Sequence, residues 1–129
     1  MPKLILIAED EPDLRTIAEF RLRKAGYDVV AAADGGEALE LARQKRPDLA
    51  ILDIRMPVMD GIELCKRINS DPELCSVPVI MITASKDIAD RQIRDSGAQG
   101  CLIKPFDFRD LFRMVDRYLK EPQRAGQAA

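Results

Sequence analysis

Short apolar runs alternate along this chain with longer segments in which apolar residues recur every three or four positions. The runs Leu4–Ala8 and Leu49–Leu52 contain no charged residue, which is typical of strands buried on both faces. The segment Pro12–Ala25 keeps helical spacing, with Pro12 suited to a first turn and Gly26 to a helix end. This alternation predicts an α/β domain in which helices flank a parallel sheet.

The same pattern divides the whole chain into strands and helices. The expected strands are Leu4–Ala8, Asp28–Ala32, Leu49–Leu52, Val77–Ile82 and Gly100–Ile103. The expected helices are Pro12–Ala25, a segment between an Asp34 cap and Pro47, a segment with Leu64, Cys65 and Ile68 between the Arg55–Gly61 loop and the break at Ser70–Pro72, Asp87–Ser96, and a segment after an Asp107 cap. Asp28–Ala32 is placed near an edge, and the thin apolar stripe of Asp87–Ser96 predicts a weakly anchored helix. Residues 1–121 are predicted to form one domain and residues 122–129 a disordered tail.

Composition narrows the possible chemistry. The 129 residues carry a net charge of −2 and a pI near 5.2, which provides no basic surface for non-specific nucleic-acid binding. No apolar stretch approaches the ~20 residues that cross a membrane. Histidine is absent, which excludes Ser-His-Asp and Cys-His catalytic centres. Cys65, Cys75 and Cys101 have no metal-type spacing, and we expect reduced thiols in a cytoplasmic protein.

Polar residues follow the ends of four apolar runs: Glu9, Asp10, Asp53, Thr83 and Lys104. The carboxyl ends of parallel strands lie at one edge of a sheet, where α/β proteins bind ligands. We therefore expect three carboxylates, one hydroxyl and one ammonium to converge. Crowded carboxylates need a cation, and oxygen donors without His or Cys favour Mg²⁺, with Mn²⁺ as an alternative.

Asp53 stands alone at its strand end, before a Pro-Gly loop, and is the candidate nucleophile. Attack of its carboxylate on phosphorus would give an aspartyl phosphate. Lys104 and the cation would neutralise the phosphoryl oxygens, and the Thr83 hydroxyl would donate a hydrogen bond to one of them. Taken singly, each residue is explained as well by a surface charge, a turn cap or a strand end, so the prediction depends on their combination.

Five separated motifs resemble the receiver domain of two-component response regulators, in order and at the usual spacing, over roughly residues 3–120. The motifs are Ile5–Pro12, Pro47–Pro57, Met59–Gly61, Pro78–Ala84 and Lys104–Phe106. The resemblance implies a flavodoxin-like (βα)5 fold, a three-layer sandwich around a parallel five-stranded sheet of order 2-1-3-4-5.

The resemblance also implies how the acidic residues work. Asp53 corresponds to the phosphoacceptor and also to a metal ligand, and Asp10 to a direct metal ligand. Glu9 stands where Asp is commoner and corresponds to an acid that binds the metal through water. The backbone carbonyl of Arg55 corresponds to the third protein ligand of the metal.

The phosphate-binding residues implied by the resemblance are Thr83, Ala84 and Lys104, with Thr83 also acting as the switch hydroxyl. The Lys104–Pro105 peptide is expected to be cis. The family usually has an aromatic switch residue three places before the lysine, and this chain has Cys101 there. The inward swing of an aromatic ring therefore cannot report phosphorylation in the usual way.

The function implied is a switch that takes a phosphoryl group from a sensor histidine kinase or a histidine phosphotransfer protein. Such a domain promotes its own phosphorylation and dephosphorylation, and its fourth helix, fifth strand and fifth helix change affinity for a downstream protein. We expect a monomer or weak dimer without membrane or nucleic-acid contacts, as a single-domain regulator or a part of a longer protein. Cys101 leaves open a constitutive interaction module that does not use phosphorylation. A hydrolase with an aspartyl intermediate ranks low, because Arg55 stands where its second aspartate would be needed.

Overall fold

The sheet is parallel throughout and contains five strands in the computed structural model, which describes residues 2–84 and 90–120. The strands are β1 (Leu4–Ala8), β2 (Asp28–Ala32), β3 (Leu49–Asp53), β4 (Val79–Thr83) and β5 (Gly100–Ile103). Their order is β2-β1-β3-β4-β5, and every neighbouring pair is parallel. The predicted flavodoxin-like topology and the edge position of β2 are therefore confirmed.

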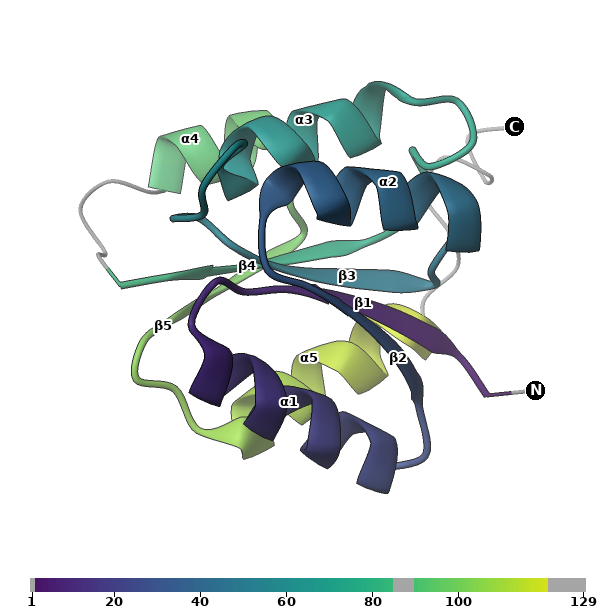
Figure 1. Ribbon diagram of the computed structural model, residues 1–129, viewed down its shortest axis with the longest axis vertical. Helices are drawn as coiled ribbons and strands as arrows, with labels where there is room; N and C mark the ends of the chain where they lie inside the picture. The colour runs from purple at the N-terminus through teal and green to yellow at the C-terminus, as the bar shows by residue number, and fades with distance from the viewer. Residues whose placement is uncertain (1, 85–89, 121–129) are drawn as a thin grey trace.

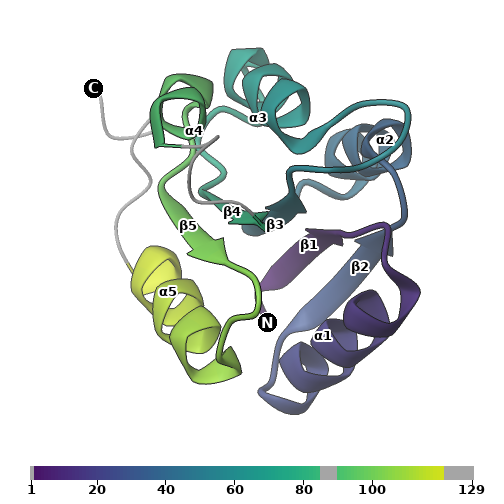
Figure 2. The same cartoon turned by 90° about the vertical axis from the view of Figure 1, so that its left-hand side faces the viewer.

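Helices cover both faces of the sheet and make a three-layer sandwich. They are α1 (Pro12–Lys24), α2 (Gly35–Lys45), α3 (Gly61–Ser70), α4 (Asp90–Ser96) and α5 (Phe108–Lys120). Figures 1 and 2 show α2, α3 and α4 on one face of the sheet and α1 and α5 on the other.

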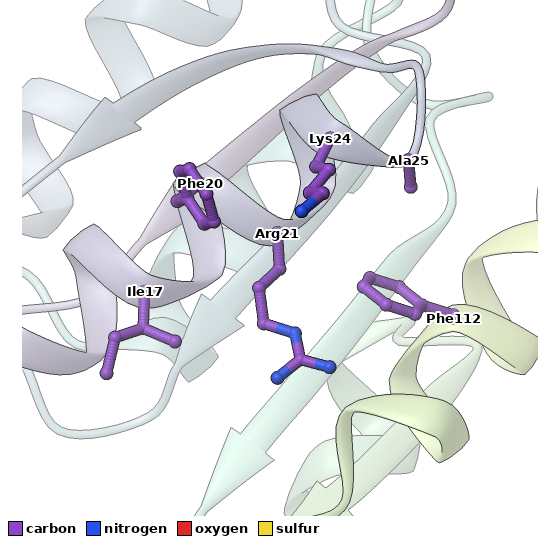
Figure 3. Close-up of a pocket in the computed structure, with 6 residues that line it drawn as sticks. All are labelled: Ile17, Phe20, Arg21, Lys24, Ala25 and Phe112. Carbon is purple, nitrogen blue, oxygen red and sulfur yellow. The ribbon is translucent and has the colours of Figure 1, made fainter.

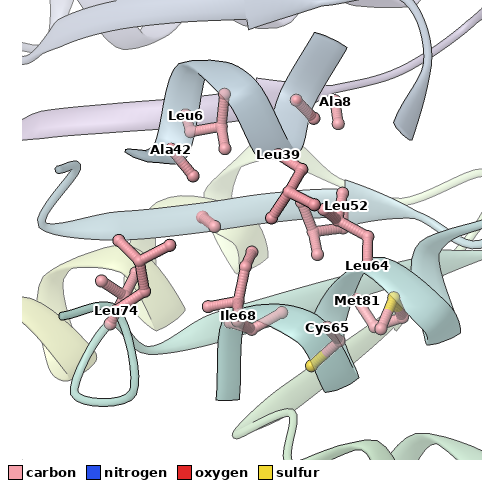
Figure 4. Close-up of a cluster of buried hydrophobic side chains, with 14 of the residues drawn as sticks. Leu6, Ala8, Leu39, Ala42, Leu52, Leu64, Cys65, Ile68, Leu74 and Met81 are labelled. Atoms are coloured by element: carbon pink, nitrogen blue, oxygen red, sulfur yellow. The ribbon is translucent and has the colours of Figure 1, made fainter. Parts of the chain in front are cut away.

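Two apolar cores lie on the two faces of the sheet, because successive strand residues point to opposite sides. The core beneath α2, α3 and α4 includes Leu6, Leu52, Leu64, Ile68 and Met81 (Figure 4). The core beneath α1 and α5 includes Ile7, Leu22, Ile51, Ile80 and Leu111. Each fully buried aliphatic side chain stabilises the fold by about 1.5–3 kcal/mol. Burial on both faces explains why β1, β3 and β4 contain uncharged apolar runs.

The helix starts follow the local signals in the sequence. Oδ1 of Asp34 accepts a hydrogen bond from the Glu37 amide at 2.7 Å, so the predicted cap of α2 is confirmed. Oδ1 of Asp107 accepts from the Arg109 amide at 2.8 Å at the start of α5. These caps satisfy amide groups that have no partner within the helix.

Some predicted boundaries differ from the structure or lie outside the described residues. The strand expected from Val77 begins at Val79 instead and continues to Thr83, because Pro78 has no amide hydrogen for a ladder. The expected helix start at Asp87 and the tail 122–129 lie outside the described residues. Within the described ranges, no helix combines the length and apolarity needed to cross a membrane.

Candidate functional site

The three predicted carboxylates meet at the carboxyl edge of the sheet. Strand pairing places Ala8 opposite Leu52, so Glu9 and Asp53 leave neighbouring strands side by side. One carboxylate oxygen from each of Glu9, Asp10 and Asp53 lies within 4.8 Å of the others. The Glu9 and Asp53 side chains are only 2% and 6% exposed, whereas Asp10 is exposed. The cluster is thus buried on its inner side and open to solvent through Asp10.

The backbone around Glu9 holds its carboxylate in place. Its amide continues the sheet by donating to the Ala32 carbonyl at 3.0 Å, and its carbonyl accepts from Nη1 of Arg15 at 2.9 Å. Oε2 accepts from the Glu11 amide at 3.2 Å. The first turn of α1 and the end of β1 therefore fix Glu9 together.

Lys104 brings a positive charge into the same cluster from the end of β5. Its Nζ lies 3.1 Å from Oδ2 of Asp53 and 3.1 Å from Oε1 of Glu9. Glu11 lies at the margin of this contact, with Oε2 4.0 Å from Nζ. The Lys104 side chain is only 21% exposed, so solvent and salt weaken its interactions with the carboxylates less than they would at the surface.

Burial and charge shift the protonation of two groups in the site. Burial raises the pKa of the Glu9 carboxyl to about 7, and a hydrogen bond with Asp53 and the Asp53 charge add to that effect. Burial alone would lower the pKa of the Lys104 ammonium. Its hydrogen bonds and charge interactions with Glu9 and Asp53 outweigh burial and leave that pKa above its usual value.

The cluster fits a hard divalent cation. Three carboxylates face one ammonium, and the pKa of Glu9 is raised first by burial and then by the neighbouring Asp53, so a bound cation would favour the ionised carboxylate. Oε1 of Glu9 is buried and accepts no hydrogen bond within the described residues, although it contacts the Lys104 ammonium as an ion pair. An oxygen-only donor set of this kind suits Mg²⁺ or Mn²⁺.

Two predicted phosphate-binding residues, the last residue of β4 and the residue after it, lie at the same edge of the sheet. Thr83 ends the strand and is buried, and the next residue, Ala84, is exposed. The Thr83 carbonyl accepts a hydrogen bond from the Lys104 amide at 2.8 Å. The structure therefore couples the backbone of the predicted switch residue to that of the predicted phosphate-binding lysine.

The loop between β3 and α3 folds back onto Asp53. The Arg55 amide donates to Oδ1 of Asp53 at 3.4 Å, and the Gly61 amide donates to the Ile54 carbonyl at 2.8 Å. A Cβ on Gly61 would overlap the carbonyl oxygen of Asp53, so only glycine allows α3 to begin this close to the strand. The Arg55 carbonyl as a metal ligand stays a prediction.

Two features near the site are not evident from the sequence. Val58 has a φ of 71°, in the left-handed region that disfavours a β-branched residue. Its side chain is largely exposed, so little burial offsets that strain. The second feature is Glu11, an exposed acid whose carboxylate approaches the Lys104 ammonium. In the sequence, only its position next to the Glu9-Asp10 pair indicates that it lies near the site.

The remaining sequence expectations concern β5. The Lys104–Pro105 peptide is cis, as expected. Cys101 is partly buried and packs against the core beneath α2, α3 and α4. A small thiol therefore stands at the position that the resemblance assigns to an aromatic switch residue.

Comparison with known proteins agrees with this fold and with an acidic site at the carboxyl edge of the sheet. The family model of the response regulator receiver domain matches residues 5–116. The DNA-binding dual master transcriptional regulator RpaA of Synechocystis sp. is 41% identical over 130 residues, covering 100% of this chain and 54% of that protein. The chain spans about half the length of the curated relatives it matches.

Solved structures give the same result. A putative response regulator from Chloroflexus aurantiacus superposes with a TM-score of 0.89 at 37% identity, covering 94% of this chain and 100% of the other. The receiver domain of a Pseudomonas aeruginosa sensor histidine kinase has a magnesium ion coordinated in its active-site cleft. It superposes with a TM-score of 0.87 at 34% identity, covering 94% of this chain and 100% of that domain.

The fold and its acidic edge thus define a receiver domain of two-component signalling. The chain belongs to the response regulator receiver domain family.

Proposed function

We propose that this receiver domain, residues 1–121, accepts a phosphoryl group on Asp53 in a Mg²⁺-dependent reaction. The observation that carries the proposal is the placement of the Lys104 ammonium 3.1 Å from Oδ2 of Asp53, inside a cluster of three carboxylates. Such a cluster binds a cation, and the ammonium then faces an incoming phosphoryl group. Support also comes from the magnesium ion held by the Pseudomonas aeruginosa receiver domain.

The chain's own residues divide the chemistry among them. A carboxylate oxygen of Asp53 attacks phosphorus, the donor P–N bond breaks, and its electron pair returns to the donor imidazole nitrogen. Lys104 balances negative charge on the phosphoryl oxygens, and the Thr83 hydroxyl and Ala84 amide donate hydrogen bonds to them. Glu9, Asp10, Asp53 and the Arg55 carbonyl would hold Mg²⁺, which supplies positive charge to the same oxygens when bound.

The donor histidine must lie outside this sequence. The sequence contains no histidine, so the phosphohistidine comes from a sensor histidine kinase or a histidine phosphotransfer protein. Water later removes the phosphoryl group from Asp53, and the domain returns to its starting state. We place this exchange in the cytoplasm, with the domain acting as a monomer or weak dimer.

The output is a change in binding of a downstream protein at α4, β5 and α5. The backbone hydrogen bond from the Lys104 amide to the Thr83 carbonyl supports this route, because a displacement of Thr83 is passed to β5. RpaA is described as DNA-binding, but this chain spans about half of that protein, so the proposal is limited to the receiver domain itself. A constitutive interaction module is the second candidate, favoured by Cys101 at the aromatic switch position.

The test is phosphoryl transfer from a small donor. We expect acetyl phosphate with Mg²⁺ to add one phosphoryl mass to the intact protein. Omission of Mg²⁺ or substitution of Asp53→Asn should remove the adduct. An absent adduct on the wild-type protein, or an undiminished adduct on Asp53→Asn, would reject the proposal.

A further inference from the structure

The basic side chains of α1 fall into two groups. They are Arg15, Arg21, Arg23 and Lys24. Arg21 and Lys24 border a cavity between α1 and α5 (Figure 3), and each packs on an aromatic ring. Arg15 and Arg23 instead donate to main-chain carbonyls, both at 2.9 Å, with the acceptor of Arg15 at the end of β1 and that of Arg23 within β2. Arg15 is therefore the member of this set that contacts the carboxyl edge of the sheet.

Arg15 holds the peptide group that joins two of the candidate metal ligands. Its Nη1 donates to the carbonyl of Glu9, which belongs to the peptide bond between Glu9 and Asp10. Because that peptide group is planar, the direction of its carbonyl sets the direction in which the chain leaves β1. The Asp10 side chain is exposed, so its position depends on this backbone more than on packing.

The turn between β1 and α1 has few other restraints. Within the described residues, the side chain of the N-cap residue Glu11 makes no capping bond to α1, whereas Asp34 and Asp60 cap α2 and α3. The Glu11 amide donates within the turn, but its acceptor is Oε2 of the Glu9 carboxylate. A cation bound by that carboxylate competes for the same oxygen. The Arg15 bond fixes the turn while it leaves both carboxylates free.

The charge of Arg15 does not explain its position. Arg15 is the fourth residue of α1, and the helix dipole does not favour a cation near a helix N-terminus. Within residues 2–84 and 90–120, it forms no ion pair with Glu9 or Asp10. A positive charge near the carboxylates also repels a divalent cation, so the electrostatic effect of Arg15 alone opposes metal binding. Any benefit to the metal site must come from its hydrogen bond.

We propose that Arg15 is a positioning residue of the metal site, which holds the turn between Glu9 and Asp10 in the geometry that Mg²⁺ requires. The inference rests on the proposed function, because it concerns the same metal site. Mg²⁺ demands nearly octahedral coordination, so a turn that is fixed in advance loses less freedom when the ion binds. Linkage gives the converse, that bound Mg²⁺ strengthens the Arg15 bond.

Arg23 provides a matched control for the test. It donates to the Val29 carbonyl at the same distance, pairs with Glu19, and lies at the other end of α1. By isothermal titration calorimetry, we expect Arg15→Met to weaken Mg²⁺ binding at least about tenfold, and Arg23→Met to leave it within about twofold. Arg15→Lys keeps a charge and a donor, and should bind Mg²⁺ more tightly than Arg15→Met. Thermal melting checks that each variant is folded.

Phosphoryl labelling separates this role from the chemistry on Asp53. With acetyl phosphate, Arg15→Met should need at least about tenfold more Mg²⁺ for half-maximal labelling, while its maximal rate stays within about twofold of the wild type. A wild-type protein that neither binds Mg²⁺ nor takes the label would reject both proposals. A wild-type protein that does both, with Arg15→Met equal to it in Mg²⁺ affinity, would reject only the role of Arg15.

A measurement on the wild-type protein needs no variant. Nitrogen-detected NMR of the guanidinium groups follows the exchange of their Nη hydrogens with water. Linkage predicts slower exchange at Arg15 when Mg²⁺ is added, and no change at Arg23. Equal exchange at Arg15 with and without Mg²⁺ would show that other contacts fix the turn. Tighter Mg²⁺ binding by Arg15→Met would show that the charge of Arg15 outweighs its bond, and either result would overturn the inference.

Discussion

The ammonium nitrogen of Lys104 lies 3.1 Å from Oδ2 of Asp53, although 51 positions separate the two residues in the chain. Parallel strands β3 and β5 bring their carboxyl ends to the same edge, and β4 between them sets the spacing. Lys104 also contacts Glu9, so one cation offsets two buried carboxylates. The contacts of Lys104 with Asp53 and Glu9 are the part of the site whose charge balance can be tested most readily.

Removal of the Lys104 charge should slow phosphoryl transfer. We expect Lys104→Met to reduce the initial rate of labelling by acetyl phosphate at least about tenfold, because the incoming phosphoryl oxygens lose their ammonium partner. In metal-free buffer at pH 8, the free energy of unfolding should fall by roughly 1–3 kcal/mol, since Glu9 and Asp53 then face each other unpaired. Lys66→Met, an exposed lysine on α3, is the control. Equal labelling rates for the two variants would contradict this role of Lys104.

Stability without metal should decrease as the pH rises. The pKa of Glu9 is raised from 4.5 to about 7 in the folded protein, so its contribution is complete below pH 4.5 and is lost as the pH rises through about 7. Between pH 5.5 and 8 in EDTA, urea unfolding should show a loss on the order of 2 kcal/mol from this group. Glu9→Gln isolates the effect, because the unfolding free energy of this variant should lack the part of the pH dependence that comes from titration of Glu9. Identical pH profiles for the two proteins would contradict the assignment.

The affinity for Mg²⁺ should increase as the pH rises. Mg²⁺ requires ionised carboxylates, so binding below about pH 7 displaces a proton from Glu9 and should weaken roughly tenfold per pH unit. Isothermal titration calorimetry in buffers of different ionisation enthalpy measures both the affinity and the proton released. An affinity independent of pH between 6 and 8, with no proton release, would count against Glu9 as part of the metal site.

The glycine that begins α3 should not accept a side chain. Gly61→Ala would force its Cβ onto the Asp53 carbonyl oxygen, so we expect a loss of about 1–3 kcal/mol in unfolding free energy and weaker Mg²⁺ binding. The comparison is Gly36→Ala in α2, where the new Cβ would lie 3.1 Å from Cγ1 of the exposed Val58. That contact is offset by the helix propensity of alanine, so this variant should be about neutral. Equal stability of the two variants would show that the loop moves freely away from β3.

Much of this site could be predicted from the sequence, because the carboxyl ends of all strands in a parallel sheet lie at one edge. Uncharged runs predicted strands, and the residues after them had to meet at one edge, which brought Glu9, Asp53 and Lys104 together as expected. The β4 boundary was wrong by two residues at its start, because the apolar pattern runs through Pro78 while hydrogen bonding does not. The pattern could not give the raised pKa of Glu9, which arises from burial and from its distance to Asp53. Nor could it give the left-handed backbone of Val58, since that residue type disfavours the conformation.

The switch hypothesis and the constitutive alternative differ in one measurable respect. Because the Thr83 carbonyl accepts from the Lys104 amide, displacement of Thr83 should alter hydrogen exchange at the end of β4 and in β5. We expect altered protection there and in α4 when Mg²⁺ and beryllofluoride are added, with β2 unchanged. Asp53→Asn should show no change. Identical exchange in wild type with and without the mimic would favour the constitutive module.

The central claim is that Asp53 carries the phosphoryl group, and mapping the modified residue tests it most directly. Borohydride reduces an acyl phosphate to an alcohol, so treatment after labelling should convert Asp53 to homoserine, which peptide mass spectrometry locates. We predict homoserine at position 53 in samples containing Mg²⁺ and unmodified Asp53 in samples containing EDTA. Homoserine at Asp10 or at another acid, or conversion of Asp53 that persists in EDTA, would contradict the account.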